Sequence, residues 1–295
     1  MFEEAQLYSP VTQDDDGRVV VQLGADHPGF HDPAYRSRRN EIAAAAMAWL
    51  PGQPAPTIAY TDVENEIWRV VSAELRAKHA KYACADFLEA KAALALPEDR
   101  VPQLEEVTAS LAPLTGFRYH PAPGLVELRE FYGALADRVF HSTQYVRHPS
   151  GPLYTPEPDI IHEVIGHGNM LASPRLAEVK RAAGEAARRV ETDEALQFIA
   201  DVFWFTLEFG VVWEAGELKA YGAGILSSYG EIEEFRSMEI RPLDFGEMGM
   251  IEYDITKYQP VLYAAESMGH VEEAVGGFFE TADDDTPARY TVAAS

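Results

Sequence analysis

Two histidines five residues apart, His162 and His167, are the residues whose types and spacing first indicate chemistry in this sequence. They lie in the stretch TPEPDIIHEVIGHGNML, from Thr155 to Leu171. Histidine is the commonest side-chain ligand of transition metals, so the pair is a candidate metal site. The spacing disfavours a zinc peptidase, in which two histidines four residues apart share one helical face. On a regular helix four residues rotate by only about 40°, whereas five rotate by about 140°.

The glycine between the histidines offers a way to bring both rings to one metal ion. A glycine just past the end of a helix adopts the left-handed conformation easily. We therefore expect the helix to end at Gly166 and the chain to turn His167 back toward His162. The alternative on these residues alone is two ordinary histidines, one on a helix and one on a loop.

Glu208 is the candidate third ligand. Apolar residues at 196, 199, 200, 203, 204 and 207 form a helical stripe, and Glu208 follows at its margin. A carboxylate beside so apolar a face is either solvated at a rim or paired with a cation. Two histidines and one carboxylate form the facial triad of non-haem Fe(II) oxygenases, which leaves positions open for O2 and a cosubstrate. A surface glutamate is the ordinary alternative.

The wider sequence resembles the catalytic domain of the pterin-dependent aromatic amino acid hydroxylases, which include the phenylalanine, tyrosine and tryptophan hydroxylases. The resemblance rests on PDIIHEVIGH, WFTLEFG and AYGAGILSSYGE, with ADHPGFHDPAYRSRR and PGQPAPTIAYTDVENEIW before them and YQPVLYAAES after them. These motifs cover most of the chain in one order. The sequence is most similar to the bacterial phenylalanine hydroxylases, which implies a single catalytic domain and a monomer.

The resemblance implies a role for each matching residue. It assigns Fe(II) to His162, His167 and Glu208, and catalysis to Glu163 and His141. For the tetrahydropterin (tetrahydrobiopterin or a related pterin) it implies a site built from Gly124, Leu125, Val126, Phe131, Glu163 and Phe203. For the amino acid substrate it implies Arg147 as the carboxylate clamp, with Thr155, Pro158, Trp204, Phe209, Ser227 and Glu231 around it. The alternatives are core packing for Phe131 and a routine surface charge for Arg147.

The implied reaction is an Fe(II)- and tetrahydropterin-dependent monooxygenation, with O2 as cosubstrate, of the ring of a free aromatic amino acid. Trp204 and Ile255 favour L-phenylalanine as substrate and L-tyrosine as product. Gly168 and Asn169 replace the family's usual Val-Pro close to the metal motif, so meta-hydroxylation of phenylalanine stays open. Hydroxylation of tryptophan in secondary metabolism is a further alternative. A zinc metallopeptidase with Glu163 as base is a remote one.

The elements that must position these residues are predicted to be mostly helices. Proline and glycine punctuate the apolar periodicity, as at Pro51-Gly52 and Pro97. We expect helices at residues 36–50, 62–95 with a break near 83, 101–112, 127–140, 176–190, 195–212, 258–268 and 271–279. We expect short strands or looped ribbons at residues 18–23, 116–124 and 218–231. The predicted fold class is mainly α with minor β, with residues 1–23 as an N-terminal extension, 24–275 as the catalytic domain and 276–295 as an acidic, flexible tail.

The charge and composition of the chain limit the kinds of partner that it is expected to bind. The formal net charge of −24 disfavours nucleic acid, whose phosphates need clustered Lys and Arg, and anionic membranes. Cys84 is the only cysteine, so no internal disulfide forms and a reducing compartment is expected. The sequence shows no leader-like segment and no run of about eighteen apolar residues. These observations predict a cytoplasmic protein whose partners are a small amino acid and a pterin.

Overall fold

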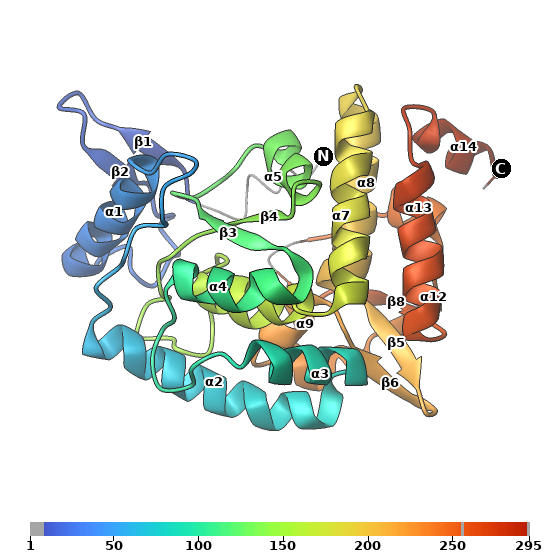
Figure 1. The fold of residues 1–295 in the computed structure, drawn as a ribbon, viewed down its shortest axis with the longest axis horizontal. Coiled ribbons are helices and arrows are strands. Elements are labelled where there is room, and N and C mark those ends of the chain that lie inside the picture. Colours follow the sequence, from blue (N-terminus) through green and yellow to red (C-terminus); the bar gives the residue numbers. More distant parts are fainter. Residues whose placement is uncertain (1–8, 255–256, 294–295) are drawn as a thin grey trace.

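Helices of very different lengths make up most of the molecule, and three small sheets lie among them (Figure 1). The computed structural model describes residues 9–254 and 257–293. The helices are α1 (Pro33–Met47), α2 (Asp62–Tyr82), α3 (Ala85–Leu94), α4 (Leu104–Thr115), α5 (Leu128–Leu135), α6 (Asn169–Leu171), α7 (Pro174–Arg189), α8 (Asp193–Phe203), α9 (Ala223–Ser227), α10 (Glu231–Glu234), α11 (Phe245–Met248), α12 (Met268–His270), α13 (Gly276–Thr281) and α14 (Thr286–Ala293), with the π-helices η2 (His162–Gly168), η3 (Trp204–Glu208) and η5 (Val271–Val275) and the 3-10 helix η4 (Phe235–Ser237). The strands are β1 (Val11–Gln13), β2 (Val19–Val21), β3 (Arg118–Pro121), β4 (Val139–Ser142), β5 (Val211–Glu214), β6 (Glu217–Ala220), β7 (Glu239–Pro242) and β8 (Val261–Ala265). The predicted fold class, mainly α with minor β, is confirmed.

The two helices α2 and α3 show how local sequence sets the framework. A capping box of Thr61 and Glu64 begins α2, and its buried stripe includes Trp68, Val71 and Leu75. The predicted break near residue 83 is confirmed, because Cys84 starts α3 after an extended backbone turn. The backbone N–H of Cys84 donates to the carbonyl of Ala220, so the break ties the helices to the end of β6.

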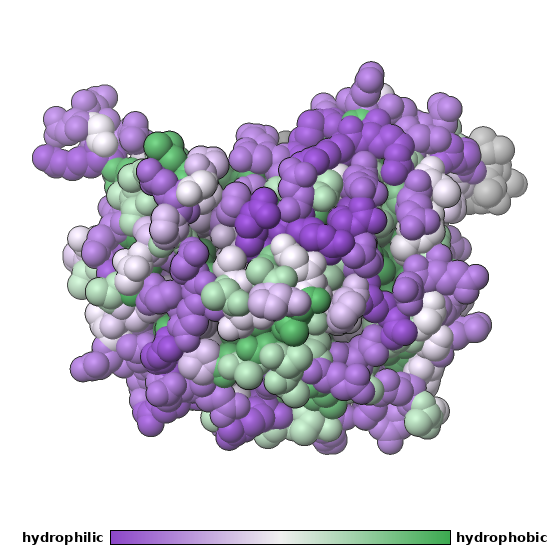
Figure 2. Space-filling view, viewed as in Figure 1, coloured by the Kyte–Doolittle hydropathy of each residue, from purple (hydrophilic) through white to green (hydrophobic). Residues whose placement is uncertain are grey.

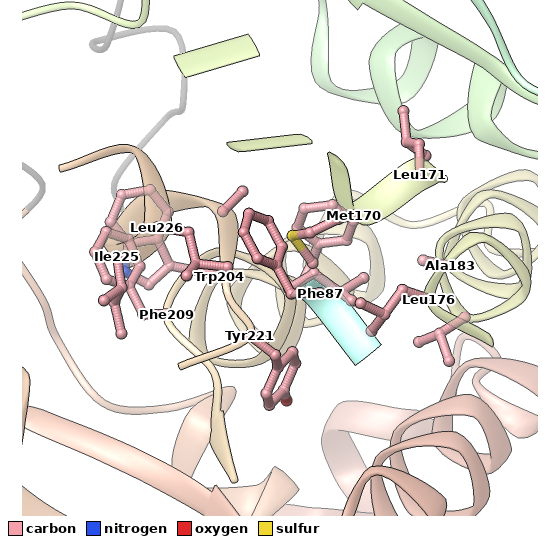
Figure 3. Close-up of a cluster of buried hydrophobic side chains, with 14 of the residues drawn as sticks. Phe87, Met170, Leu171, Leu176, Ala183, Trp204, Phe209, Tyr221, Ile225 and Leu226 are labelled. Carbon is pink, nitrogen blue, oxygen red and sulfur yellow. The ribbon is translucent and has the colours of Figure 1, made fainter. Parts of the chain in front are cut away.

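Helix α7 (yellow in Figure 1) packs against α5 and α13. Gly184 permits the approach to the end of α5, since a Cβ atom there would lie 2.2 Å from the backbone nitrogen of Ala136. The core behind these helices is continuous. Figure 3 shows Trp204, Phe209, Ile225 and Leu226 on one side of it and Met170, Leu171, Leu176 and Ala183 on the other.

The four-stranded sheet has the order β6-β5-β8-β7, and β8 contradicts the helix predicted for residues 258–268. Val261 to Ala265 are all buried, and β8 pairs in parallel with both β5 and β7. A short, wholly apolar run has no periodicity that separates a buried strand from a buried helix. Residues 261–265 form a strand because backbone pairing with β5 on one edge and β7 on the other is available only to an extended chain.

Three further expectations differ from the structure. The helix predicted for residues 127–140 ends at Leu135, because Arg138 adopts φ 57° and the chain turns into β4, which runs parallel to β3. The ribbon predicted for residues 218–231 contains the short helix α9. The flexible tail predicted from residue 276 is wrong, since α13 and α14 are helices and Phe279 is fully buried.

The surface of the face seen in Figure 1 is largely hydrophilic, with apolar patches between the charged residues (Figure 2). Within residues 9–254 and 257–293, no helix has the length and apolar character needed to cross a membrane.

Candidate metal and substrate site

The two histidines lie on one face because their segment is a π-helix and not because the helix stops. The helix η2 runs from His162 to Gly168, and a π-helix bonds residues five apart. The expected left-handed glycine is therefore wrong, since Gly166 lies inside the helix and has no positive φ. Gly166 has a packing role instead: a Cβ atom there would lie 2.9 Å from the carbonyl oxygen of Ala223 in α9.

A second π-helix carries Glu208. The helix η3 continues α8 and ends at Glu208, with the N–H of Phe209 bonded to the carbonyl of Trp204 five residues earlier. The α9 segment packs closely on this end, since a Cβ atom on Gly222 would lie 2.3 Å from the carbonyl oxygen of Glu208. The two π-helices thus present their polar side chains to each other.

The polar atoms of the three residues converge. Nε2 of His162 and Nε2 of His167 lie 3.1 Å apart. The Glu208 carboxylate lies 3.0 Å from Nε2 of His167 and 3.8 Å from Nε2 of His162. Glu163 is the next carboxylate, with an oxygen within 4.8 Å of both imidazoles. Two nitrogens and one carboxylate that meet this closely form a donor set suited to a transition-metal ion.

The tautomer of His162 suits metal binding through Nε2. Its Nδ1 lies 2.8 Å from Oγ of Ser227, which lies 3.4 Å from the carbonyl of Gly224. The serine hydroxyl can donate to the carbonyl and accept from Nδ1–H, which leaves the Nε2 lone pair for a metal. Sequence analysis expected Ser227 beside the substrate; Ser227 does line the cavity, and its hydroxyl lies against His162.

His167 has a different partner. Its Nδ1 lies 2.7 Å from Nζ of Lys180, which is fully buried in α7. The ammonium group also lies 5.4 Å and 5.3 Å from the ring centres of Phe140 and Phe203. Sequence analysis missed Lys180, because an isolated lysine on an alanine-rich helix looks like a solvated residue.

Burial shapes the charges of the cluster. It lowers the pKa of His162 to about 4, and His167 adds to this effect. Burial, with Lys180 beside it, also holds the pKa of His167 well below its usual value. Burial raises the pKa of Glu208. Both imidazoles are therefore neutral near pH 7, which is the form that binds a metal ion.

Arg147 is paired inside the protein. Its Nε and Nη2 donate to the two carboxylate oxygens of Asp159 at 2.9 and 2.8 Å, and both side chains are buried. The backbone N–H of Arg147 bonds the same carboxylate. Arg147 is thus held rigidly at the cavity wall.

The cluster lies in a cavity of about 510 Å³. The structure places all but one of the predicted site residues along its wall: Gly124, Leu125, Val126, Phe131, His141, Arg147, Thr155, Pro158, His162, Glu163, His167, Trp204, Glu208, Phe209, Ser227 and Glu231. The exception is Phe203, which lies behind the wall and packs edge-on against Tyr132 with ring centres 4.9 Å apart. Its ring belongs to the core, so the expected pterin contact is wrong.

The walls of the cavity differ in character. Trp204 and Phe209 form an apolar corner with ring centres 4.6 Å apart, and Tyr253 stacks behind Trp204 at 5.1 Å. Glu231 also lines the cavity, is buried, and accepts from the N–H of Gln259. Burial raises its pKa to about 7. The wall also contains Tyr154, Glu157, Tyr229, Lys257 and Tyr258, which sequence analysis did not single out.

Sequence analysis based substrate choice partly on Ile255, Gly168 and Asn169, and none of the three is among the described residues that line the cavity. Ile255 lies outside the described residues. Gly168 and Asn169 do not line this cavity, and the Asn169 side chain instead borders a second cavity behind η2. The residues that replace Val-Pro are therefore not part of the wall of this cavity.

Comparison with known proteins gives a family and several relatives. Residues 17–294 match the family described as biopterin-dependent aromatic amino acid hydroxylase. The chain is 53% identical over 262 residues to phenylalanine 3-hydroxylase of Streptomyces coeruleorubidus, covering 89% of this chain and 94% of that protein. It is 41% identical over 276 residues to phenylalanine-4-hydroxylase of Rattus norvegicus, covering 92% of this chain and 61% of that protein. It thus spans less than two thirds of the rat relative.

Solved structures of bacterial phenylalanine hydroxylases match the fold of this chain. The apo structure of the cold-active phenylalanine hydroxylase of Colwellia psychrerythraea matches with a TM-score of 0.75 and 29% identity, covering 83% of this chain and 94% of that one. A structure of Chromobacterium violaceum phenylalanine hydroxylase with bound iron(III) and 7,8-dihydrobiopterin matches with a TM-score of 0.73 and 27% identity, covering 82% of this chain and 86% of that one.

Proposed function

This chain belongs to the family of biopterin-dependent aromatic amino acid hydroxylases, and from that premise we propose that it hydroxylates free L-phenylalanine at carbon 3 of the ring, giving meta-tyrosine. The observation that carries the reaction class is the convergence of His162, His167 and Glu208 in one cavity with the apolar corner of Trp204 and Phe209. The ring position rests on the 53% identity to a phenylalanine 3-hydroxylase. It favours the meta alternative over the para product that sequence analysis preferred.

The donor set fits an iron ion. Two neutral imidazoles and one carboxylate leave a partly neutralised Fe(II) with open positions, and the hydrogen bond from His162 to Ser227 presents Nε2 to it. We assign His162, His167 and Glu208 as the ligands. Iron and the tetrahydropterin supply the activation of O2 when bound, and the protein supplies binding, orientation and exclusion of water.

Arg147 is the proposed partner of the substrate carboxylate. Asp159 occupies Nε and Nη2 of its guanidinium, which fixes the plane of the group. A guanidinium has five N–H donors, so others stay available for a carboxylate in the cavity. With the carboxylate held there, the substrate ring would lie against Trp204 and Phe209, and Glu231 would face the polar end of the substrate.

The pterin is proposed to lie against the part of the cavity wall that Gly124 to Val126 and Phe131 form. Gly124, Leu125 and Val126 offer backbone groups along that wall, and Phe131 offers a ring for stacking. A side chain at Gly124 would press on Val11, since a Cβ atom there would lie 2.7 Å from it. The N-terminal hairpin of β1 and β2 therefore supports the proposed pterin loop from behind.

Product analysis tests the proposal. The purified protein would receive Fe(II), tetrahydrobiopterin, O2 and phenylalanine, tyrosine or tryptophan in turn, and products would be separated against ortho-, meta- and para-tyrosine standards. We expect meta-tyrosine to dominate with phenylalanine. A dominant para-tyrosine peak would contradict the ring position and leave the enzyme class intact.

Two controls complete the test. Glu208→Ala should lose activity and bound iron while it stays folded, and omission of the pterin should stop product formation. Activity with zinc in place of iron, on peptides, would instead support the metallopeptidase alternative. The expected monomer and cytoplasmic location stay predictions, and size-exclusion chromatography with light scattering tests the first.

A further inference from the structure

Two neighbouring residues near the end of α2, Lys78 and His79, bond the chain on either side of Ser227. Nε2 of His79 lies 2.6 Å from the carbonyl oxygen of Leu226, the residue before Ser227. Nζ of Lys78 lies 2.6 Å from the carbonyl oxygen of Tyr229, two residues after it. Both side chains are buried. The end of α2 thus holds the segment 226–229 at two points.

The hydrogen bonds of His79 fix its orientation. A carbonyl oxygen only accepts, so the Nε2–H group of His79 donates to Leu226 and its Nδ1 is an acceptor. Nζ of Lys91 in α3 lies 3.0 Å from this Nδ1 and donates to it. The ring of Phe87 packs edge-on against the imidazole, with ring centres 4.9 Å apart. Burial lowers the pKa of His79 to about 3, so the ring is neutral and has a single N–H group, which bonds the carbonyl oxygen.

The ammonium group of Lys78 has three contacts with the chain that follows Ser227. Besides the carbonyl of Tyr229, it pairs with the carboxylate of Glu233 at 2.8 Å. It also lies 3.3 Å from the centre of the Tyr229 ring, which gives a cation–π contact. Lysine is rarely buried unless it is paired, and here every one of these partners belongs to residues 229–233. Lys78 therefore ties α2 to this stretch of chain.

The segment that Lys78 and His79 hold carries two polar groups of the site. The Ser227 hydroxyl lies 2.8 Å from Nδ1 of His162, and Glu231 is buried in the cavity wall. Ser227 ends α9, which has only five residues. A helix this short is not stable by itself, and its last carbonyls have no partner inside it. The bonds from α2 supply partners that the segment lacks.

Helix α9 transmits its position to both metal-binding helices, because it contacts η2 and η3 as well as α2. In Figure 1, α2 runs along one edge of the molecule, with α9 further inside. The fit of α9 to η2 is tight, since a Cβ atom on Gly166 would lie 2.9 Å from the carbonyl oxygen of Ala223. A shift of α9 toward or away from α2 would therefore move Ser227 relative to His162.

We propose that Lys78 and His79 are positioning residues of the hydroxylation site. His79 sets the place of the Ser227 hydroxyl, and thereby the orientation of the His162 ring. Lys78 sets the place of the Glu231 carboxylate. The described wall of the cavity does not include Lys78 or His79, so both act through residues 226–231. The inference rests on the proposed function, in which His162 binds the metal ion and Glu231 faces the polar end of the substrate.

Co(II) affinity of the full chain, measured by competition with a chelating dye, tests the role of His79. His79→Leu removes the donor to Leu226, so we expect the affinity to fall about fivefold or more. His79→Gln, whose amide N–H can replace Nε2–H, should keep the affinity within about twofold of the wild type. The control is Ile67→Ala, a buried change about 18 Å earlier along α2. It should lower the unfolding temperature and leave the Co(II) affinity unchanged.

Steady-state kinetics tests the role of Lys78. Lys78→Met should raise the KM for phenylalanine about fivefold or more, because Glu231 loses its fixed place. The KM for the pterin and kcat should change much less. Lys81→Met, an exposed change of the same charge in the same helix, is the control and should alter neither KM. Equal changes of the two KM values in Lys78→Met would contradict the assignment to Glu231.

Hydrogen exchange on the metal-free chain separates this inference from the proposed function. Backbone amides of residues 223–231 should exchange about tenfold faster in His79→Leu and in Lys78→Met, because the segment opens more often. Lys78→Met, the milder change, keeps this test available if His79→Leu does not fold. Unchanged exchange would overturn the positioning role whether or not the wild type binds a metal ion.

The Co(II) measurements give a second route to refutation. Wild-type Co(II) affinity in His79→Leu would overturn the role of His79, because the bond to Leu226 would not matter at the metal site. A loss of affinity that His79→Gln does not restore would overturn it equally, since the donor itself would not be the cause. Failure of the wild type to bind Co(II) or form product would instead overturn the proposed function, and the exchange rates would still decide whether α2 holds the segment.

Discussion

Nζ of Lys180 lies 2.7 Å from Nδ1 of His167, and the lysine is fully buried between Phe140 and Phe203. A metal ion on Nε2 requires the ring proton of His167 on Nδ1, so Lys180, whose pKa burial lowers to about 8, must accept from Nδ1–H as the neutral amine. Loss of a partner that accepts from the distal N–H of a metal-binding histidine typically costs 10–100-fold in metal affinity or activity. This contact is the basis of the first prediction.

At about pH 9, where Lys180 is the neutral amine, its replacement by methionine should weaken metal binding about tenfold. The metal-free protein should be as stable as the wild type or more so, because methionine fills the space without a buried charge. Competition with a chelating dye measures Co(II) affinity, and thermal unfolding measures stability. Lys81→Met controls for the loss of one positive charge at the surface. A Co(II) affinity within twofold of the wild type would show that Lys180 does not position His167.

Arg147→Lys should raise the KM for phenylalanine at least tenfold and leave the KM for the pterin nearly unchanged. A lysine keeps the charge but loses the planar fork, which binds Asp159 on one side and is proposed to bind the substrate carboxylate on the other. Arg147→Ala should in addition destabilise the fold by about 3 kcal/mol, because it leaves the buried Asp159 unpaired. Steady-state kinetics and denaturant unfolding give the two readouts. Equal changes in both KM values would count against the carboxylate role.

Trp204→Phe should shift the kcat/KM ratio toward tryptophan over phenylalanine, by about tenfold. Trp204 is fixed by Tyr253 behind it, by Phe209 beside it and by a hydrogen bond from its indole nitrogen to Gln259. A smaller ring at this wall leaves room for an indole, and contacts of this size are worth about 1–3 kcal/mol. The exposed Trp213 provides the control variant, Trp213→Phe. An unchanged ratio in Trp204→Phe would remove Trp204 from the specificity wall.

Asp201→Asn should stabilise the protein at pH 8 and have little effect near pH 4. Burial raises the pKa of Asp201 from 3.8 to about 6, although Gln197 and Tyr253 donate hydrogen bonds to it. The folded state therefore prefers the protonated acid, so its stabilising contribution is complete below the unfolded pKa and is lost as pH rises through about 6. The neutral amide avoids that loss.

Thermal unfolding between pH 4 and pH 8 measures this effect. The difference between Asp201→Asn and wild type should grow through pH 6, to roughly 2 kcal/mol at most. The exposed Asp26→Asn is the control. A difference that does not change with pH would mean that Asp201 stays ionised throughout the range.

The sequence by itself determined the chemistry of the candidate site and most of its members. The types and order of His162, His167 and Glu208 predicted an iron-binding set, and the family resemblance predicted the cavity wall around it. Local rules also predicted several elements, such as α2 with its capping box and the break before α3. These features depend on residue types close together in the chain, which a sequence displays directly.

The tertiary structure decided how those residues meet. Two π-helices, not a glycine turn, align the histidines and Glu208, and the close approach of α9 at Gly166 and Gly222 holds these helices together. It also decided that Ser227 bonds His162, that Lys180 bonds His167, and that Asp159 bonds Arg147. The partners of Ser227 and Lys180 lie 65 and 13 residues away along the chain. Only packing sets such contacts, because no local periodicity records which distant side chain fills the space beside a ring.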